Sequence, residues 1–166
     1  MLDRMRETLF SVLQGQVEGK VFADLYAGTG AVGIEALSRR ASRAIFVESS
    51  AAAIELIRAN LQELGAQEDA RILFSPVANV LRDLQADIAF LGPPYSAAEE
   101  YENTLTALGQ SGPPLVIAQH GRSKPLADQY GRLERFRTIE MGRNALSFFG
   151  TMEQPPDDSQ ATGNSL

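Results

Sequence analysis

Ala23-Asp24-Leu25-Tyr26-Ala27-Gly28-Thr29-Gly30 is the stretch that decides the fold of this chain. Residues 21–25 form a short apolar run typical of a buried strand, and a carboxylate lies at its end. Two glycines follow, and glycine lets the backbone turn tightly and approach a ligand closely. Residues 31–40 then carry apolar side chains at helical spacing. The stretch therefore predicts a strand that turns through glycines into a helix.

Strands and helices alternate outward from this stretch. Because the early strands are apolar throughout, they predict an α/β fold with a mostly parallel sheet covered by helices on both faces. Further strands are expected at 44–47, 71–74, 87–91 and 115–119, and a closing antiparallel pair at 133–140 and 145–150. Helices are expected at 2–14, 31–40 and 97–109, and another runs from a cap at Ser49 or Ser50 to Gly65. A weak helix is expected at 79–84 and a short helical piece at 124–130.

Composition restricts the class of protein. The 166 residues are 44% hydrophobic and 22% charged, which predicts one ordinary globular domain over 1–150. Residues 151–166 are polar, acidic and rich in Pro, Gly and Ser, and we expect a disordered tail there. No apolar run reaches the ~18 residues of a membrane span, and no secretory signal is visible. Without cysteine there are no disulfides or thiolate zinc sites. We expect a cytoplasmic monomer without metal.

The charge is unevenly distributed. The net charge of -6 contrasts with the basic face expected of a nucleic-acid enzyme. Basic residues nevertheless gather just before the acidic tail, and they either bind nucleic acid or form an ordinary solvated surface. They are Arg122, Lys124, Arg132, Arg135, Arg137 and Arg143.

The strand ends point to a nucleoside cofactor. Ligands of parallel sheets bind beyond the carboxyl ends of strands, where Asp24, Glu48 and Gly92 are expected. The six-residue glycine pattern from Gly28 to Gly33 also occurs in dinucleotide sites, but Asp24 beside it would repel a phosphate. That carboxylate suits a cationic ligand such as S-adenosylmethionine. Glu48 can accept hydrogen bonds from both ribose hydroxyls, or else only cap the next helix.

The turn Gly92-Pro93-Pro94-Tyr95 predicts a site for a flat base. An exocyclic amine is a poor nucleophile, and two acceptors that hold its hydrogens turn its lone pair toward a methyl donor. The Pro93 carbonyl is one candidate acceptor, and Tyr95 can stack on the ring. An Asp or Asn side chain at position 92 would normally be the other. Glycine there predicts a loss of ~1–3 kcal/mol, roughly tenfold to a hundredfold in rate, unless water fills the gap.

Together these residues resemble the bacterial 16S ribosomal RNA guanine-966 N2-methyltransferases. The likeness covers about residues 3–150: Arg6-Glu7-Thr8-Leu9-Phe10, the stretch from Asp24 to Gly30, Gly33-Ile34-Glu35-Ala36-Leu37-Ser38-Arg39, Glu48, Asn60-Leu61, Pro93-Pro94-Tyr95, His120-Gly121 and Leu146-Ser147-Phe148-Phe149. The resemblance implies the Rossmann-like class I methyltransferase fold with a seven-stranded sheet, S-adenosylmethionine as donor, and 16S rRNA or a small-subunit particle as partner.

The resemblance also implies site residues. Cofactor-binding positions are Asp24, Tyr26, Ala27, Gly28, Gly30, Glu48, Ser49, Val77 and Ala78. Catalytic positions are Gly92, Pro93, Pro94 and Tyr95, and RNA-binding positions are Arg4, Arg6 and Tyr95, although the two arginines can equally form a solvated helix face.

The chain departs from the family in four ways. Position 92 lacks the usual acid, the segment from Ser75 to Ala78 lacks the acid that reaches the adenine amine, and the usual Glu-His pair is Gln119-His120. The basic hairpin that precedes the first helix is missing, so we expect it to be encoded upstream of Met1 or to be lost, which would weaken RNA binding.

Two other functions stay open at this point. The glycine pattern fits a nicotinamide-dependent oxidoreductase, although no acid-base group for hydride transfer is evident. Gly92 and Val77 fit a catalytically weakened relative that only binds RNA or a ribosomal partner. His120, the single histidine, is either a general base or a packing residue at a strand end.

Overall fold

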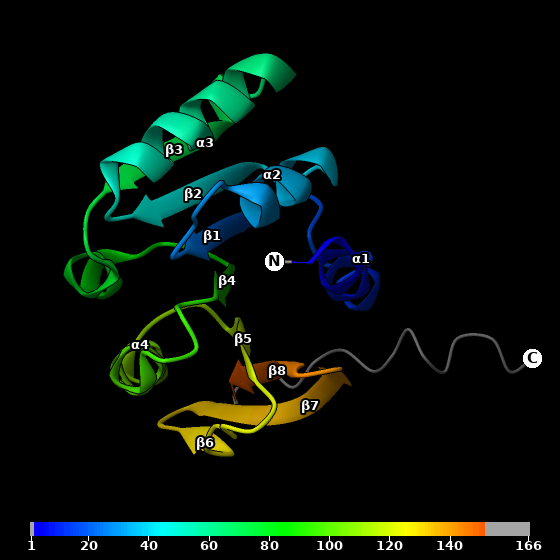
Figure 1. Cartoon of the computed structure of the whole chain (residues 1–166), viewed down its shortest axis with the longest axis vertical. Coiled ribbons are helices and arrows are strands. Elements are labelled where there is room, and N and C mark those ends of the chain that lie inside the picture. Colours follow the sequence, from blue (N-terminus) through cyan, green and yellow to red (C-terminus); the bar gives the residue numbers. More distant parts are fainter. Residues whose placement is uncertain (1, 152–166) are drawn as a thin grey trace, which may run out of the picture.

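The computed structural model describes residues 2–151 as an eight-stranded sheet in the order β3-β2-β1-β4-β5-β8-β7-β6 (Figure 1). Strands β1 to β5 are parallel, and β8 runs antiparallel between β5 and β7. The expected mostly parallel sheet with a terminal antiparallel pair is thereby confirmed. The strands are β1 Val21–Leu25, β2 Arg43–Glu48, β3 Ala70–Phe74, β4 Ile88–Leu91, β5 Leu115–Gly121, β6 Gln129–Tyr130, β7 Leu133–Met141 and β8 Asn144–Thr151.

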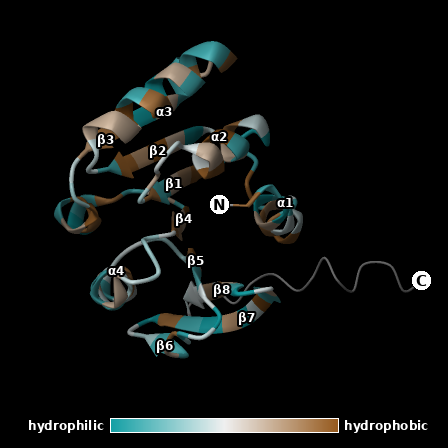
Figure 2. Cartoon of the chain, in the orientation of Figure 1, coloured by the Kyte–Doolittle hydropathy of each residue, from teal (hydrophilic) through white to brown (hydrophobic). Residues whose placement is uncertain are grey.

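Helices cover both faces of the sheet. Figure 1 shows α1 and α4 on opposite sides of the central strands. Hydrophilic and hydrophobic residues alternate along α1 and α3 in Figure 2, as burial of one helix side requires. The helices are α1 Asp3–Val12, α2 Ala31–Ser38, α3 Ala51–Leu64 and α4 Ala98–Gln110, with short 3-10 helices η1 Gln67–Asp69, η2 Val77–Asn79 and η3 Leu81–Asp83. No helix of the described part is long and apolar enough to cross a membrane.

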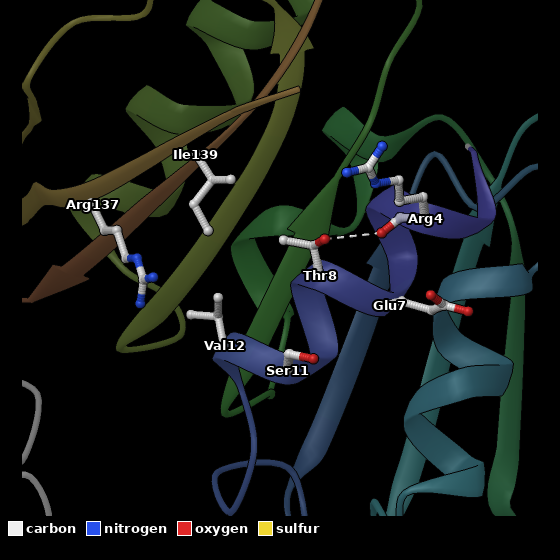
Figure 3. Close-up of a pocket in the computed structure, with 7 residues that line it drawn as sticks. All are labelled: Arg4, Glu7, Thr8, Ser11, Val12, Arg137 and Ile139. Atoms are coloured by element: carbon white, nitrogen blue, oxygen red, sulfur yellow. Dashed lines mark hydrogen bonds between the residues drawn. The ribbon is translucent and has the colours of Figure 1, made fainter. Parts of the chain in front are cut away.

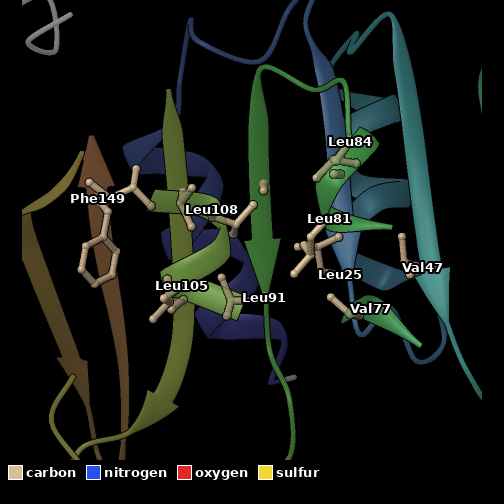
Figure 4. Close-up of a cluster of buried hydrophobic side chains, with 14 of the residues drawn as sticks. Leu25, Val47, Val77, Leu81, Leu84, Leu91, Leu105, Leu108 and Phe149 are labelled. Atoms are coloured by element: carbon tan, nitrogen blue, oxygen red, sulfur yellow. The ribbon is translucent and has the colours of Figure 1, made fainter. Parts of the chain in front are cut away.

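The core lies in two layers, one on each face of the sheet. On one face, Phe10 of α1 and Phe22 of β1 are fully buried, and their ring centroids lie 5.9 Å apart. On the other face, leucines of η3 and α4 pack against Leu25 and Leu91 (Figure 4). Because strands alternate their side chains, neighbouring residues of β1 serve opposite layers. This double burial explains why the early strands are apolar throughout.

Local signals at helix ends behave as expected. Ser50 caps α3, because its hydroxyl accepts the Ala53 N–H at 3.3 Å. Gly65 ends α3 in the left-handed conformation with φ 67°. Gly33 is required by space: a Cβ there would lie 2.4 Å from the ring of Phe46. The helix after the glycine turn therefore packs directly on β2.

Two expected helices are wrong. Residues 79–84 do not form one weak helix, because two short 3-10 helices, η2 ending at Asn79 and η3 over Leu81–Asp83, are separated by Val80. Residues 124–130 contain no helix and end in β6. Gly109 lets β6 approach α4 closely, because a Cβ there would lie 1.9 Å from the carbonyl oxygen of Tyr130, and the Arg132 N–H donates to the Gly109 carbonyl at 3.0 Å. That contact between distant segments is invisible to local periodicity.

The two-residue β6 is the eighth strand, one more than expected. Thr151, the first residue of the expected tail, is the last residue of β8. The remainder of that tail, 152–166, lies outside the described residues.

Candidate active site at the carboxyl edge of the sheet

The strand ends of β1, β2 and β4 meet at one edge of the sheet. Leu25 pairs with Val47 on one side and with Leu91 on the other. Chain order reverses between β1 and β4, which is the position where open α/β sheets bind ligands. Asp24, Glu48 and Gly92 therefore come together as predicted.

Asp24 is a buried carboxylate among aromatic rings. Its exposed fraction is 1%, and its register neighbours are Phe46 and Phe90. Its Oδ2 accepts the Gly33 N–H at 2.9 Å. Burial raises the pKa of Asp24 to about 7, against the lowering effect of that hydrogen bond, and the charge of Glu48 adds to the rise. A cationic ligand at this edge would stabilise the ionised form.

The turn after β1 is built from left-handed residues. Tyr26, Gly28 and Gly30 have φ of 61°, 58° and 81°. A Cβ on Gly28 would meet nothing within 4 Å, so the space beside this glycine is open to a ligand. The Ala27 N–H donates to the Val47 carbonyl at 3.0 Å, and the Asn60 side chain holds the Thr29 carbonyl at 3.0 Å. These bonds fix the loop across two strands and α3.

The Tyr26 side chain turns toward α4. Its hydroxyl donates to Glu100 Oε2 at 2.6 Å and lies 2.7 Å from Thr104 Oγ1. Partial burial and the hydrogen bond to the Glu100 carboxylate raise the pKa of this phenol. The Tyr26 hydroxyl therefore makes its hydrogen bonds to residues of α4. The main chain of Tyr26 is the part that shapes the loop.

Glu48 holds the loop and the start of the next helix. Its Oε1 accepts the Gly28 N–H at 2.9 Å, and its Oε2 accepts the Ser50 N–H at 2.8 Å. Each carboxylate oxygen keeps further lone pairs, so ribose hydroxyls can still bind. Ser49 follows Glu48 in the chain and is exposed. Glu48 thus binds the backbone at the start of α3, as the capping alternative expects. Its binding of ribose hydroxyls stays a prediction.

The segment after β3 borders the same site. The Ser75 N–H donates to the Glu48 carbonyl at 3.0 Å. The Val77 side chain is buried beside Leu25 and Val47 (Figure 4), whereas Ala78 is exposed. Because the Val77 side chain belongs to the core, its main chain is the part available to a ligand. Neither residue supplies a polar side chain for an adenine.

The Gly-Pro-Pro-Tyr turn follows β4 beside this loop. Pro93 is buried and Pro94 is exposed. The Tyr101 hydroxyl lies 2.6 Å from the Gln119 carbonyl and 3.1 Å from the Pro93 carbonyl. A single phenol proton serves the shorter bond, so the Pro93 carbonyl keeps accepting capacity. Its role as an acceptor for a base stays a prediction.

Tyr95 is anchored at both its ring and its hydroxyl. A Cβ on Gly121 would lie 3.5 Å from Tyr95 Cδ2, so the ring sits against β5. The hydroxyl donates to Asn144 Oδ1 at 2.6 Å and accepts from Gln119 Nε2 at 2.9 Å. Sequence reasoning missed Gln119 and Asn144 as site residues, because only the register of β4, β5 and β8 brings them to Tyr95.

His120 packs against β8, and together with Tyr95 it lines a small cavity of about 190 Å³. It is 3% exposed, and its Nε2 lies 2.7 Å from Ser147 Oγ. Burial lowers the pKa of His120. Side chains alternate along β5, so Gln119 and His120 point to opposite faces. The packing alternative is therefore the one that the structure supports.

The basic residues differ in whether an acidic side chain pairs with them. Arg4 and Arg137 lie toward opposite ends of an open groove of about 730 Å³ between α1 and β7 (Figure 3). Arg6 instead pairs with Asp3 at 3.1 Å on the same helix. In the expected basic segment, Arg122 pairs with Glu140 and Arg135 pairs with Asp128, so those charges are partly neutralised. Within residues 2–151, no group of three or more His, Asp or Glu side chains could hold a metal ion.

Comparisons with known proteins agree with this arrangement. Residues 1–150 match the family described as "Conserved hypothetical protein 95". The chain is 31% identical over 132 residues to "Ribosomal RNA small subunit methyltransferase D" of Haemophilus influenzae, covering 75% of this chain and 68% of the relative. It is 27% identical over 156 residues to "Putative rRNA methyltransferase YlbH" of Bacillus subtilis, covering 89% and 84%.

A solved structure agrees in fold as well. "Putative methyltransferase yhhF from Escherichia coli" superposes with a TM-score of 0.82 at 28% identity and covers 92% of this chain and 89% of its own. The sheet order and these matches confirm the Rossmann-like class I methyltransferase fold. The chain belongs to the "Conserved hypothetical protein 95" family, the family of ribosomal RNA small subunit methyltransferases that its sequence resembles.

Proposed function

We propose that this protein is an S-adenosylmethionine-dependent rRNA methyltransferase that methylates the exocyclic N2 of a guanine in 16S rRNA. The observation that carries the proposal is the adjacency of the glycine loop after β1 and the Gly-Pro-Pro-Tyr turn after β4. One edge thereby offers a cofactor site and a base site side by side. Membership of an rRNA methyltransferase family supports methyl transfer over the hydride transfer of the oxidoreductase alternative.

The residues at the edge fit the donor. Gly28 leaves open space beside the loop, Asp24 supplies a carboxylate for the cationic part, and Glu48 supplies one for the ribose. S-adenosylmethionine supplies an activated methyl group when bound. The protein's contribution is placement of the two reactants.

Pro93 and Tyr95 would position the base. The Pro93 carbonyl accepts one hydrogen of the amine, and the ring of Tyr95 stacks on the purine. The amine lone pair then forms the N–C bond while the C–S bond breaks and sulfur keeps the bonding pair. The amine proton passes to water. No side-chain base is needed for this step, which agrees with the buried position of His120.

The direct test uses an unmodified 16S rRNA transcript, free or assembled into small subunits. With S-adenosylmethionine carrying a tritiated methyl group, we expect label in the RNA and N2-methylguanine in its nuclease digest. The same ligand at millimolar concentration should raise the melting temperature. Label at another nucleoside would contradict the guanine-N2 assignment, whereas binding of NADH without any binding of S-adenosylmethionine would support the oxidoreductase.

The groove of Figure 3 supplies a candidate contact for RNA phosphates. We expect the Arg4→Gln/Arg137→Gln double variant to bind the transcript roughly threefold to tenfold more weakly. Each lost phosphate contact should also lower the slope of log affinity against log salt by about 0.7–0.9. Filter binding at several salt concentrations measures both. Arg58→Gln is the matched control, because Arg58 lies on α3 and pairs with Glu55. Equal slopes for all three proteins would remove the groove from the RNA site.

A further inference from the structure

Gly92 has room for a Cβ atom, the first atom of the acidic side chain that the resemblance implies at position 92. A Cβ on Gly92 would lie 3.4 Å from Phe90 Cε1, an ordinary contact distance, and its φ is not left-handed. Neither space nor backbone conformation therefore requires glycine at this position. The neighbouring strand β5 carries a polar side chain beside this position.

The Gln119 side chain reaches the empty position. Leu91 pairs with Ala118, so the next residues, Gly92 and Gln119, are neighbours across β4 and β5. Gln119 Oε1 lies 3.7 Å from the Cβ that Gly92 lacks. An amide oxygen from β5 thus borders the space that an Asp carboxylate of β4 would enter.

The hydrogen-bond network fixes which end of the amide faces Gly92. The Tyr95 hydroxyl gives its proton to Asn144 Oδ1, so it can only accept from Gln119. Gln119 Nε2 is the donor of that bond, and this leaves Oε1 directed toward Gly92. Among residues 2–151, Oε1 keeps no hydrogen-bond donor of its own. It is an accepting atom held in place without an internal partner.

We propose that Gln119 Oε1 is the second acceptor for the exocyclic amine, and that it replaces the acid of position 92. This inference rests on the proposed methyl transfer. Oε1 and the Pro93 carbonyl accept one amine hydrogen each, and the lone pair turns toward the methyl group. The N–C bond forms as the C–S bond breaks, sulfur keeps the electron pair, and the proton leaves to water. The same amide positions Tyr95 through Nε2.

The replacement has a chemical consequence. A neutral amide oxygen is a weaker acceptor than a carboxylate. It also avoids adding a further carboxylate at the edge that holds Asp24, whose pKa the charge of Glu48 already raises. Gln119 therefore supplies the orientation without an added negative charge at the sheet edge.

A rescue experiment tests the assignment. With the unmodified transcript, Gln119→Ala should lower kcat about tenfold to a hundredfold, the loss expected for one oriented hydrogen bond. Adding Gly92→Asp should recover most of that loss. In the wild-type background, Gln119 already supplies the acceptor. The fold-change in kcat that Gly92→Asp causes there should therefore be at least tenfold smaller than the fold-change it causes in the Gln119→Ala variant.

His120→Ala is the matched control. It removes the neighbouring side chain of β5, which contacts Ser147 on the opposite face, and it leaves the bonds among Gln119, Tyr95 and Asn144 unchanged. Its loss should not be recovered by Gly92→Asp. Equal rescue of both variants, or no rescue of Gln119→Ala, would overturn the acceptor role and leave a purely structural one. Melting temperature with the methyl donor is measured for each variant to establish folding and binding. A wild-type chain that binds the donor but methylates no RNA would overturn the proposed function itself.

Discussion

Replacing Glu48 with alanine is expected to weaken S-adenosylmethionine binding by about a hundredfold or more. A carboxylate that accepts from both ribose hydroxyls makes two charge-assisted hydrogen bonds, each worth about 1.5–3 kcal/mol. Even the lower figure, taken twice, corresponds to a factor of about a hundred in the dissociation constant. The variant also frees the Gly28 and Ser50 N–H groups that Glu48 now holds at 2.9 and 2.8 Å. Isothermal titration calorimetry measures the loss.

The matched control is Glu55→Ala. Glu55 lies one element further on α3, is exposed, and pairs with Arg58 at 3.3 Å. Exposed pairs of this kind contribute about 0–1 kcal/mol, so binding should be unchanged. If Glu48→Ala binds the donor as tightly as Glu55→Ala does, Glu48 only caps α3 and fixes the loop. The ribose assignment would then be withdrawn.

Glu48 also illustrates what sequence can predict. An apolar strand that ends in an acid is a local pattern, and the parallel arrangement follows from uniform burial. Asp24, Glu48 and Gly92 could therefore be placed at one edge without coordinates. Ser50 and Gly65 could be read as helix ends, because cap residues act on their own backbone.

Contacts between distant segments could not be predicted in this way. Residues 124–130 read as helical, but Tyr130 packs against the backbone of Gly109 in α4 and lies in the two-residue strand β6. The same limit hid the role of Gln119. Its side chain matters because β4 and β5 pair with Leu91 opposite Ala118, and a shift of one residue would point it to the other face.

Asp24→Asn is expected to strengthen the ligand-free fold at pH 8 while it weakens donor binding. The pKa of Asp24 is raised to about 7 from an unfolded value of 3.8, chiefly by burial. The folded chain therefore binds more protons than the unfolded chain between about pH 4 and 7. The contribution of Asp24 to the free energy of unfolding therefore falls as pH rises through that window. Above pH 7 the folded protein carries the full cost of a buried charge.

Asparagine removes that cost and keeps an oxygen for the Gly33 N–H. At pH 8 the variant should be more stable than the wild type by at least about 1 kcal/mol. Near pH 4 this advantage should vanish, because the wild-type carboxyl is then protonated too. Urea unfolding of the ligand-free protein at both pH values measures the difference. A variant that is less stable at pH 8 would contradict the burial argument.

Binding should change in the opposite direction. A cationic donor favours the ionised carboxylate, so wild-type affinity should rise from pH 6 to pH 8 as Asp24 releases its proton. The asparagine variant should bind roughly tenfold to a hundredfold more weakly at pH 8 and show no such rise. Calorimetry across this range, with Asp83→Asn in η3 as an isosteric control outside the site, separates the two behaviours. The buried carboxylate that destabilises the ligand-free fold at pH 8 would then also strengthen binding of the cofactor.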